Sequence, residues 1–389
     1  MNAPELQKLT DWLIDGGRSG SHLMSETCER LVQAGLPLWR VGVFIRTLHP
    51  DIFGRNFIWH PGAEVVVGSV DFDIQNSPEF RNSPLAIVFG EGREVRHRID
   101  DPEGKRFPVF DDLRAEGVTD YIALPILFID GTINASSWTT KQPGGFSDDQ
   151  LTALRAVVRP LARVIEILSL RRTASSLLDT YVGNRAGERI LGGQIRRGHA
   201  ETMRAAIWLS DLRGFTALSD RLSPETVVEI LNFYFDCQVP AIRKHGGEIL
   251  KFMGDGLLAV FPIAEDDSDI KQVCARVLEA ARESRASVEA LHYQNGEAVE
   301  RFRFGVALHV GSILFGNIGG GNRLDFTCIG PAVNMAARIE KLASKLGRVI
   351  LGSTAFAQHL PDEFTALCEF ELAGFRSAET VFGLREDGA

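Results

Sequence analysis

Residues 247–261 read Gly-Glu-Ile-Leu-Lys-Phe-Met-Gly-Asp-Gly-Leu-Leu-Ala-Val-Phe, two apolar runs joined by Gly-Asp-Gly at positions 254–256. A short Asp-Gly turn between two apolar arms predicts a β-hairpin. Upstream, the apolar run 205–210 predicts a strand that leads directly into Asp211. We expect this strand and the hairpin to be neighbours in one sheet.

The segments around the hairpin alternate between helix and strand patterns. Ser223-Pro224 is a serine N-cap followed by proline at the first helical position, and it opens a helical pattern over residues 224–245. Residues 269–291 are predicted to be helical, 302–310 to be a strand and 311–323 to be a glycine-rich arm. From about residue 200 the chain is therefore predicted to be an α/β or α+β module.

Two aspartates stand at the ends of these predicted strands. Asp211 follows the run 205–210, and Asp255 lies in the hairpin turn. Each alone has an ordinary explanation, because aspartate is common as a helix N-cap and in Asp-Gly turns. Side by side, however, two carboxylates repel each other unless a dication lies between them, and Mg²⁺ prefers such oxygen donors together with phosphate. The pair predicts a metal site.

The chain directly after Asp211 is suited to phosphate. Leu212-Arg-Gly-Phe-Thr216 enters a turn and a predicted helix start, where free backbone N–H groups can hold an anion. Gly214 would let the backbone approach closely. The candidate phosphate-binding residues are therefore Gly214, Phe215 and Thr216.

A second polar set lies further along the chain. If Pro331 opens a helix, Asn334 and Arg338 are four residues apart and share one face. The amide can bond a hydroxyl, and the guanidinium can bind phosphate with two hydrogen bonds. A surface helix with a solvated arginine explains the same pattern equally well when this segment is taken by itself.

Four motifs in this half of the chain resemble those of the class III nucleotidyl cyclase catalytic domain. They lie in the order of that family at residues 208–216, 247–261, 311–319 and 326–338. The resemblance covers about half the chain, and it implies a ferredoxin-like βαββαβ fold at residues 200–389. It also implies a lyase that uses two divalent cations, Mg²⁺ or Mn²⁺.

The resemblance gives each candidate residue a role. Asp211 and Asp255 would hold the metals, with the backbone carbonyl of Leu212 as a further ligand. Asn334 would orient the ribose, and Arg338 would stabilise the charge of the transition state. The implied reaction is an in-line attack of the ribose 3′-oxygen on the α-phosphorus, with pyrophosphate as the leaving group.

Base selection is implied by two more positions. Lys251 stands where adenylate cyclases of this family carry lysine and guanylate cyclases usually carry glutamate, and Thr327 stands where a subgroup of adenylate cyclases has threonine. An ammonium donor suits the N1 acceptor of adenine, and a hydroxyl can accept from its N6 amino group. ATP is therefore expected over GTP. The alternatives are a guanylate cyclase and a silenced nucleotide-binding regulatory protein.

The family resemblance also implies a homodimer. Its two sites would be shared, each taking the aspartates from one protomer and Lys251, Asn334 and Arg338 from the other. The family often binds the β- and γ-phosphates with a lysine near the C-terminus, and Arg376 is the nearby cation that is expected to replace it here.

Residues 1–147 are predicted to form a separate α/β module. Apolar runs at 41–45, 64–67, 85–89 and 121–129 predict strands, and Asp130-Gly131 predicts a hairpin turn. A helix over residues 26–35 is expected to stop at its final glycine, before Pro37. This module resembles a GAF-like sensor domain, chiefly in residues 144–154 and the preceding hairpin. The resemblance implies a regulatory role and a small-molecule or signal ligand of unknown identity.

Residues 148–199 are predicted to be a helical linker. Ser147-Asp-Asp-Gln150 has the form of a capping box. Apolar residues then follow at spacings of three and four: Leu151, Leu154, Val158, Leu161, Ile165 and Leu168. They fit either a dimerising, signal-transmitting seam or a helix packed on its own sheet. Pro160 is expected to kink or interrupt the helix, and residues 173–198 to be a connector outside the core.

The amino-acid composition limits the expected binding partners and the expected cellular compartment. The chain has 389 residues, 42 Lys and Arg against 51 Asp and Glu, and a net charge of −9. An acidic chain is not expected to bind nucleic acid or an anionic membrane as its main task. Five scattered cysteines disfavour a disulfide framework or zinc site. With no apolar window long enough to span a membrane and no secretory signal, we expect a cytoplasmic protein.

Overall fold

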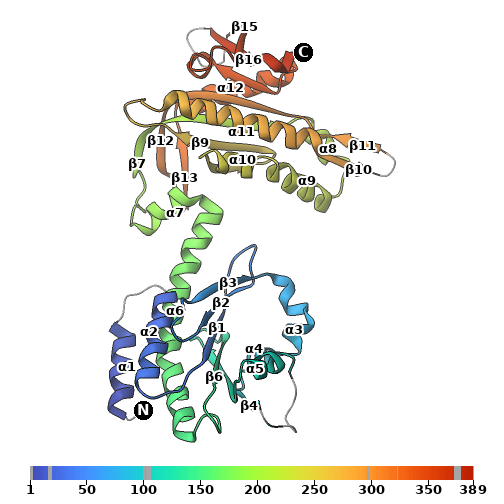
Figure 1. The fold of residues 1–389 in the computed structure, drawn as a ribbon. Coiled ribbons are helices and arrows are strands. Elements are labelled where there is room, and N and C mark those ends of the chain that lie inside the picture. Colours follow the sequence, from blue (N-terminus) through green and yellow to red (C-terminus); the bar gives the residue numbers. More distant parts are fainter. Residues whose placement is uncertain are drawn as a thin grey trace. The chain divides into compact units, whose positions relative to one another are not determined.

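The computed structural model describes residues 3–15, 20–99, 101, 107–295, 298–321, 323–371 and 378–388. The chain divides into two compact units, Met1–Leu177 and Leu178–Ala389, which are described separately (Figure 1).

A six-stranded antiparallel sheet is the centre of the first unit. Its strands run in the order β3-β2-β1-β6-β5-β4. They are β1 (Arg40–Arg46), β2 (Gly54–Trp59), β3 (Val66–Val70), β4 (Val95–Arg98), β5 (Asp120–Leu127) and β6 (Ile133–Thr140). The predicted hairpin around Asp130-Gly131 is confirmed, because β5 pairs with β6 from Asp120↔Thr140 to Leu127↔Ile133.

Helices cover both faces of this sheet. The helices α1 (Ala3–Asp15), α2 (Gly20–Gln33) and the beginning of α6 (Asp148–Val182) pack with Trp59 and Trp138 into one apolar core. On the other face, α4 (Pro84–Glu91) and α5 (Val109–Ala115) pack around Phe110 and Tyr121, next to the short helices η1 (Phe72–Asn76) and α3 (Pro78–Arg81). The resemblance of this unit to GAF-like sensors stays a prediction.

The run 85–89 is a helix, so its prediction as a strand was wrong. It lies within α4, where Ser83 is the N-cap and Pro84 occupies the first turn. The Ser83 hydroxyl accepts a hydrogen bond of 3.2 Å from the backbone N–H of Ala86. This capping satisfies an N–H group that has no partner inside the helix, and it outweighs the strand preference of the apolar residues that follow.

The helix α6 is not interrupted by Pro160, and it continues to Val182, through part of the predicted connector 173–198. A proline inside a helix costs roughly 3 kcal/mol, because it removes one hydrogen bond and its ring crowds the preceding turn. Apolar residues on both sides of Pro160 are buried against the sheet, and this burial offsets the cost: Leu151, Leu154, Val157, Val158 and Leu161. The first four heptad positions are therefore buried in their own unit, as the second of the two alternatives expects, and Ile165 and Leu168 are partly buried there.

The second unit is built on an eight-stranded sheet. Its order is β15-β16-β14-β12-β7-β9-β8, and β13 pairs with the outer half of β12. The strands are β7 (Ala200–Leu212), β8 (Glu248–Met253), β9 (Gly256–Pro262), β12 (Phe304–Gly320), β13 (Arg323–Ile329), β14 (Ile350–Ser353), β15 (Phe364–Phe370) and β16 (Glu379–Leu384). A separate two-stranded ribbon joins β10 (His292–Asn295) to β11 (Ala298–Arg301).

This unit has the predicted βαββαβ order. The strands β7, β8, β9 and β12 alternate with the helices α9 (Pro224–Asp236), α10 (Val239–Lys244) and α11 (Ile270–Ala290), and they lie in the spatial order β12-β7-β9-β8. This is the ferredoxin-like arrangement, in which the first and third strands are central. The glycine-rich arm 311–323 is not a separate loop, because β12 continues through it to Gly320.

Alternate residues of β7 enter two different cores. Ala206 and Trp208 face α9, α10 and α11, whereas Ala205 and Ile207 face α12 (Pro331–Leu346) and α7 (Asn184–Leu191). Ala186 of α7 is fully buried, so residues 184–191 belong to the core and are not only a connector. The remaining short elements are α8 (Phe215–Ser219), α13 (Thr354–Ala357) and η2 (Arg385–Gly388).

Candidate functional site

The structure brings Asp211 and Asp255 together. Ser210 at the end of β7 pairs with Leu257 of β9, so Asp211 lies beside the turn that joins β8 to β9. Gly256 closes this turn against β7, since a Cβ atom there would lie 3.3 Å from the Ser210 carbonyl oxygen. The predicted pairing of an acidic strand end with an acidic hairpin turn is therefore present.

The two carboxyls interact strongly. Burial, followed by the hydrogen bond and the negative charge of Asp255, raises the pKa of Asp211 to about 7, and the charge of Glu340 adds to this. The Asp211 Oδ1 atom is buried and has no hydrogen-bond partner among the described residues. Below about pH 7 the pair therefore tends to hold a proton in place of a second negative charge.

These residues fit the divalent cations that the motifs imply. A buried carboxylate oxygen without a donor, next to a second carboxylate, is a site that Mg²⁺ or Mn²⁺ would satisfy with charge and with oxygen coordination. In the described part of the chain no group of three or more His, Cys, Asp or Glu side chains could hold a metal by itself. The Leu212 carbonyl and the phosphates of a substrate are the ligands that would complete the coordination.

Glu340 is an acidic residue near the site that the sequence analysis missed. Burial and the charge of Asp255 raise its pKa, while Arg213 and Lys341 lower it. It can approach because Gly305 of β12 has no side chain: a Cβ atom there would lie 2.9 Å from Ala343 Cβ and 3.4 Å from Glu340 Oε1. Only the tertiary packing of α12 against β12 reveals this third negative charge.

A buried hydrogen bond is formed by Ser210, the residue before Asp211 in β7. The Ser210 hydroxyl donates a hydrogen bond of 2.6 Å to Gln238 Oε1, and both residues are buried. The neighbouring Tyr234 is fully buried, and burial raises its pKa far above the ordinary range. These neutral groups give Asp211 no positive counter-charge, which leaves that task to the cations.

The phosphate candidates lie where the chain leaves β7. Gly214 is the N-cap of α8 with φ +75°, a left-handed conformation that favours glycine. Phe215 is partly buried against the core, and Thr216 is exposed. The structure thus keeps these three residues directly after the metal candidates Asp211 and Leu212, at the start of a helix, as predicted.

Lys251 and Thr327 lie on neighbouring parts of the fold. Lys251 Nζ forms an ion pair with Asp325, and Thr327 follows Asp325 by two residues in β13, so the two share a face of that strand. A bulge between Ile249 and Lys251 shifts the register of β8 against β9. Asp325 is a residue of this group that the sequence analysis missed.

Asn334 and Arg338 lie four residues apart on α12, as the sequence predicted. Both are exposed on α12, whose Ala332, Ala336 and Ile339 are buried on the opposite side. Neither side chain has a hydrogen-bond or ion-pair partner among the described residues. Arg376, the candidate for the β- and γ-phosphates, lies outside the described residues.

Residues 199–383 match the family model described as the adenylate and guanylate cyclase catalytic domain. The match includes the acidic pair, Lys251, Thr327 and the exposed helix face. Residues 199–383 are a class III adenylate/guanylate cyclase catalytic domain. Domains of this family bind nucleotides, generally use divalent metal ions and typically dimerise.

Curated relatives of the cyclase domain include named adenylate cyclases. An adenylate cyclase of Anabaena cylindrica is 30% identical over 225 residues, which are 56% of this chain and 44% of the relative. Adenylate cyclase 1 of Rhizobium meliloti is 31% identical over 153 residues, 39% of this chain and 23% of the relative. This chain thus spans less than half the length of these relatives.

Solved structures similar to the cyclase domain include an adenylyl cyclase and a guanylyl cyclase. A bacterial light-regulated adenylyl cyclase is 24% identical and covers 48% of this chain and 92% of its own, with a TM-score of 0.42. A guanylyl cyclase is 28% identical and covers 48% of this chain and 93% of its own, with a TM-score of 0.38. In the described residues of our chain, no helix is long and apolar enough to cross a membrane.

The raised pKa of Asp211 predicts a stabilising mutation inside the cyclase domain. Between the unfolded pKa of an aspartate and about 7, the folded state binds the proton and the unfolded state does not, so stability falls as the pH rises through this window. Without divalent cations, Asp211→Asn should raise the melting temperature by several degrees at about pH 8. The gain should shrink toward about pH 4, as measured by calorimetry in chelating buffer.

Asp362→Asn is the matched control, because Asp362 is an exposed aspartate in a turn of the same unit. It should leave the melting temperature unchanged at each pH. A lower melting temperature for Asp211→Asn at about pH 8 would contradict the proposed repulsion between the two carboxyls.

Proposed function

We propose that this protein is an adenylate cyclase that converts ATP to 3′,5′-cyclic AMP and pyrophosphate in a homodimer. The observation that carries this proposal is the Asp211–Asp255 pair, whose buried, partnerless oxygen and raised pKa suit it to bind cations. Lys251 beside Thr327 supports adenine as the base.

The two aspartates would hold the cations with the Leu212 carbonyl. When bound, the cations lower the pKa of the ribose 3′-hydroxyl and neutralise the departing pyrophosphate. Asp211 gives up its proton as they bind. The backbone N–H groups after Gly214 would hold phosphate oxygens at the start of α8, because the first N–H groups of a helix have no partner inside the helix.

Arg338 and Asn334 would complete the site from a second protomer. Both are exposed on α12, with no partner in the described part of their own chain. Arg338 would bind the charge that develops on the α-phosphate, and Asn334 would hold the ribose by hydrogen bonds. Since one chain carries both sets, a two-fold dimer would contain two equivalent sites.

Asp325 and Thr327 would orient Lys251 toward adenine. The ion pair with Asp325 holds the lysine near the Thr327 hydroxyl, although both partners are partly exposed and the pair itself adds little stability. The ammonium would donate to adenine N1, and the hydroxyl would accept from the N6 amino group. Guanine presents a donor at N1 and would leave the ammonium without an acceptor.

We place the protein in the cytoplasm. All five cysteines of the chain are free, which suits a reducing compartment.

The first unit would regulate the enzyme. The helix α6 continues past the boundary of the first unit at Leu177 and ends at Val182. This helix would transmit a conformational change of the first unit to the cyclase domain.

Arg338→Ala is expected to act on the transition state. It should lower kcat by about 10²- to 10³-fold, the usual loss of one such donor, and change KM for ATP by less than about threefold. Lys345→Ala, an exposed cation two turns further along α12, should leave both constants unchanged. A change in KM alone would rule out this role.

The shared site can be tested with the same variant. Asp211→Ala and Arg338→Ala chains, each inactive alone, should regain about a quarter of wild-type activity when refolded as an equal mixture. Half of the random dimers then contain one intact site out of two. No recovery, with heterodimers present by mass spectrometry, would show that each protomer builds its own site.

Lys251→Glu tests the base. It should lower kcat/KM for ATP at least tenfold and raise kcat/KM for GTP, because the carboxylate can accept from guanine N1 and N2. Lys271 is an exposed lysine on α11, and Lys271→Glu is the control, because it changes the net charge equally and should leave both kcat/KM values unchanged. Wild-type protein with a higher kcat/KM for GTP than for ATP would favour the guanylate cyclase alternative. If Lys251→Glu leaves the ratio of the two kcat/KM values unchanged, Lys251 does not select the base.

A further inference from the structure

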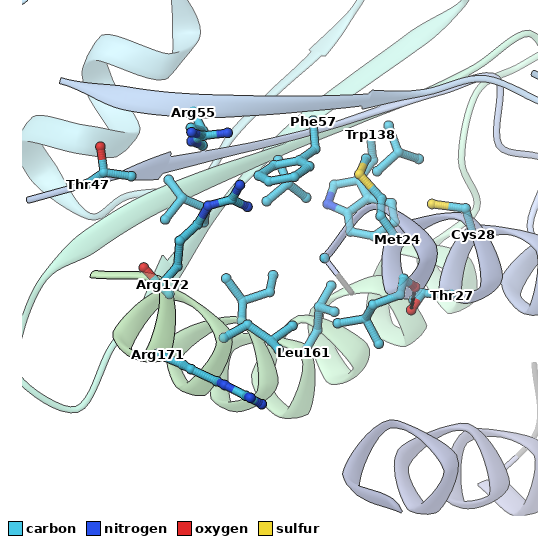
Figure 2. A pocket seen from close by; sticks show the side chains of 18 of the residues that line it. Met24, Thr27, Cys28, Thr47, Arg55, Phe57, Trp138, Leu161, Arg171 and Arg172 are labelled. Atoms are coloured by element: carbon cyan, nitrogen blue, oxygen red, sulfur yellow. Dashed lines mark hydrogen bonds between the residues drawn. The ribbon is translucent and has the colours of Figure 1, made fainter. Parts of the chain in front are cut away.

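A cavity of about 370 Å³ lies in the first unit, between the sheet and two helices. Its walls come from α2, the strands β1, β2 and β6, and residues 161–175 of α6 (Figure 2). This volume falls in the range of roughly 300–1,000 Å³ that is usual for sites of small organic ligands. The comparisons with known proteins assign no ligand to it.

Most of the wall is apolar. Met24, Trp138 and Leu161 are buried there, and Phe57 and Leu168 are partly buried. The Thr27 hydroxyl, which also lines the cavity, already donates to the Leu23 carbonyl at 2.6 Å. The inner part of the cavity therefore offers no free charge, and it suits a hydrocarbon chain or ring.

One end of the cavity is cationic. Arg55 of β2 and Arg172 of α6 extend toward the same space, whereas Arg171 also borders the cavity but directs its guanidinium away from that space (Figure 2). Partial burial and then the charge of Arg172 lower the pKa of Arg55. In the described part of the chain, no carboxylate pairs with either arginine and none lines the cavity.

Two guanidinium groups that face each other without a counter-ion favour an anion between them. The anion would remove their mutual repulsion and receive hydrogen bonds from two planar donors, the arrangement that arginines use for carboxylates. Arg55 is partly buried and Arg172 is exposed, so water solvates both charges when no ligand is bound. A cation would meet repulsion here, and a neutral ligand would form no charge-assisted hydrogen bonds with the two guanidinium groups.

We propose that this cavity binds an amphipathic organic anion, with a carboxylate between Arg55 and Arg172 and an apolar chain against Met24, Trp138 and Leu161. The carboxylate would connect β2 to α6 at Arg172, which precedes the end of that helix at Val182. Control of catalysis through this connection would rest on the proposed cyclase function, but the binding itself does not.

The test uses the full chain and isothermal titration calorimetry with hexanoate, octanoate and decanoate, below their micelle concentrations. Affinity should rise about fourfold for each added methylene until the cavity is full, because each buried methylene adds apolar contact. Decan-1-ol should bind at least tenfold more weakly than decanoate, since it has no charge for the arginines.

Two substitutions and a matched control locate the site. Arg55→Gln and Arg172→Gln should each weaken decanoate binding at least tenfold, and Arg171→Gln should change it less than twofold. Circular dichroism and melting temperature verify that the variants fold. Equal losses for Arg171→Gln and Arg172→Gln, or equal affinity for decanoate and decan-1-ol, would overturn the proposal.

A membrane lipid could supply the same chemistry as a free carboxylate. Flotation with vesicles of phosphatidylglycerol separates the two sources. Binding to these vesicles, together with no calorimetric binding of any of the three alkyl carboxylates, would show that the arginines meet a membrane surface, and the cavity proposal would be wrong. Binding of decanoate without flotation supports it.

Discussion

The repulsion between the carboxyls of Asp211 and Asp255 is the constraint around which the second unit is organised. A sheet end and a tight hairpin turn force the two acids together, and burial raises the pKa of Asp211 to about 7. The buried residues Ser210 and Gln238 beside this pair are neutral and give it no positive charge. In the proposed function, this repulsion lowers the stability of the chain without cations, and a bound cation relieves it.

The remaining candidate residues fit this account because they lack partners of their own. Arg338 and Asn334 stay exposed on α12, and Lys251 is paired only with the partly exposed Asp325. One chain therefore carries a repelling acidic pair and, on α12, two donors without partners among the described residues. A homodimer that joins the acidic pair to these donors would give each set its partner. In the first unit, Arg55 and Arg172 likewise have no counter-charge, and the proposed organic anion would supply it.

Local patterns predicted much of this fold and site. The hairpin with Asp255, the strand before Asp211 and the helix that carries Asn334 and Arg338 all depend on neighbouring residues, so their periodicity and turn residues were sufficient. The prediction failed where distant packing decides. Pro160 is tolerated because both flanks are buried, and the contacts of Glu340 and Asp325 depend on how α12 and a bulged β8 pack. The helix at residues 85–89 is different, because its Ser83-Pro84 start is a local signal that the strand prediction overlooked.

The central claim is that the aspartate pair gives up a proton when it accepts a cation, and proton release measures this directly. Mn²⁺ added with a non-hydrolysable ATP analogue to weakly buffered full-length protein should release a proton from Asp211 at about pH 6.5 and almost none at about pH 8.5. Asp211→Asn should abolish the release, after correction for the analogue alone. Equal release at both pH values, or none at about pH 6.5 despite Mn²⁺ binding, would contradict the account.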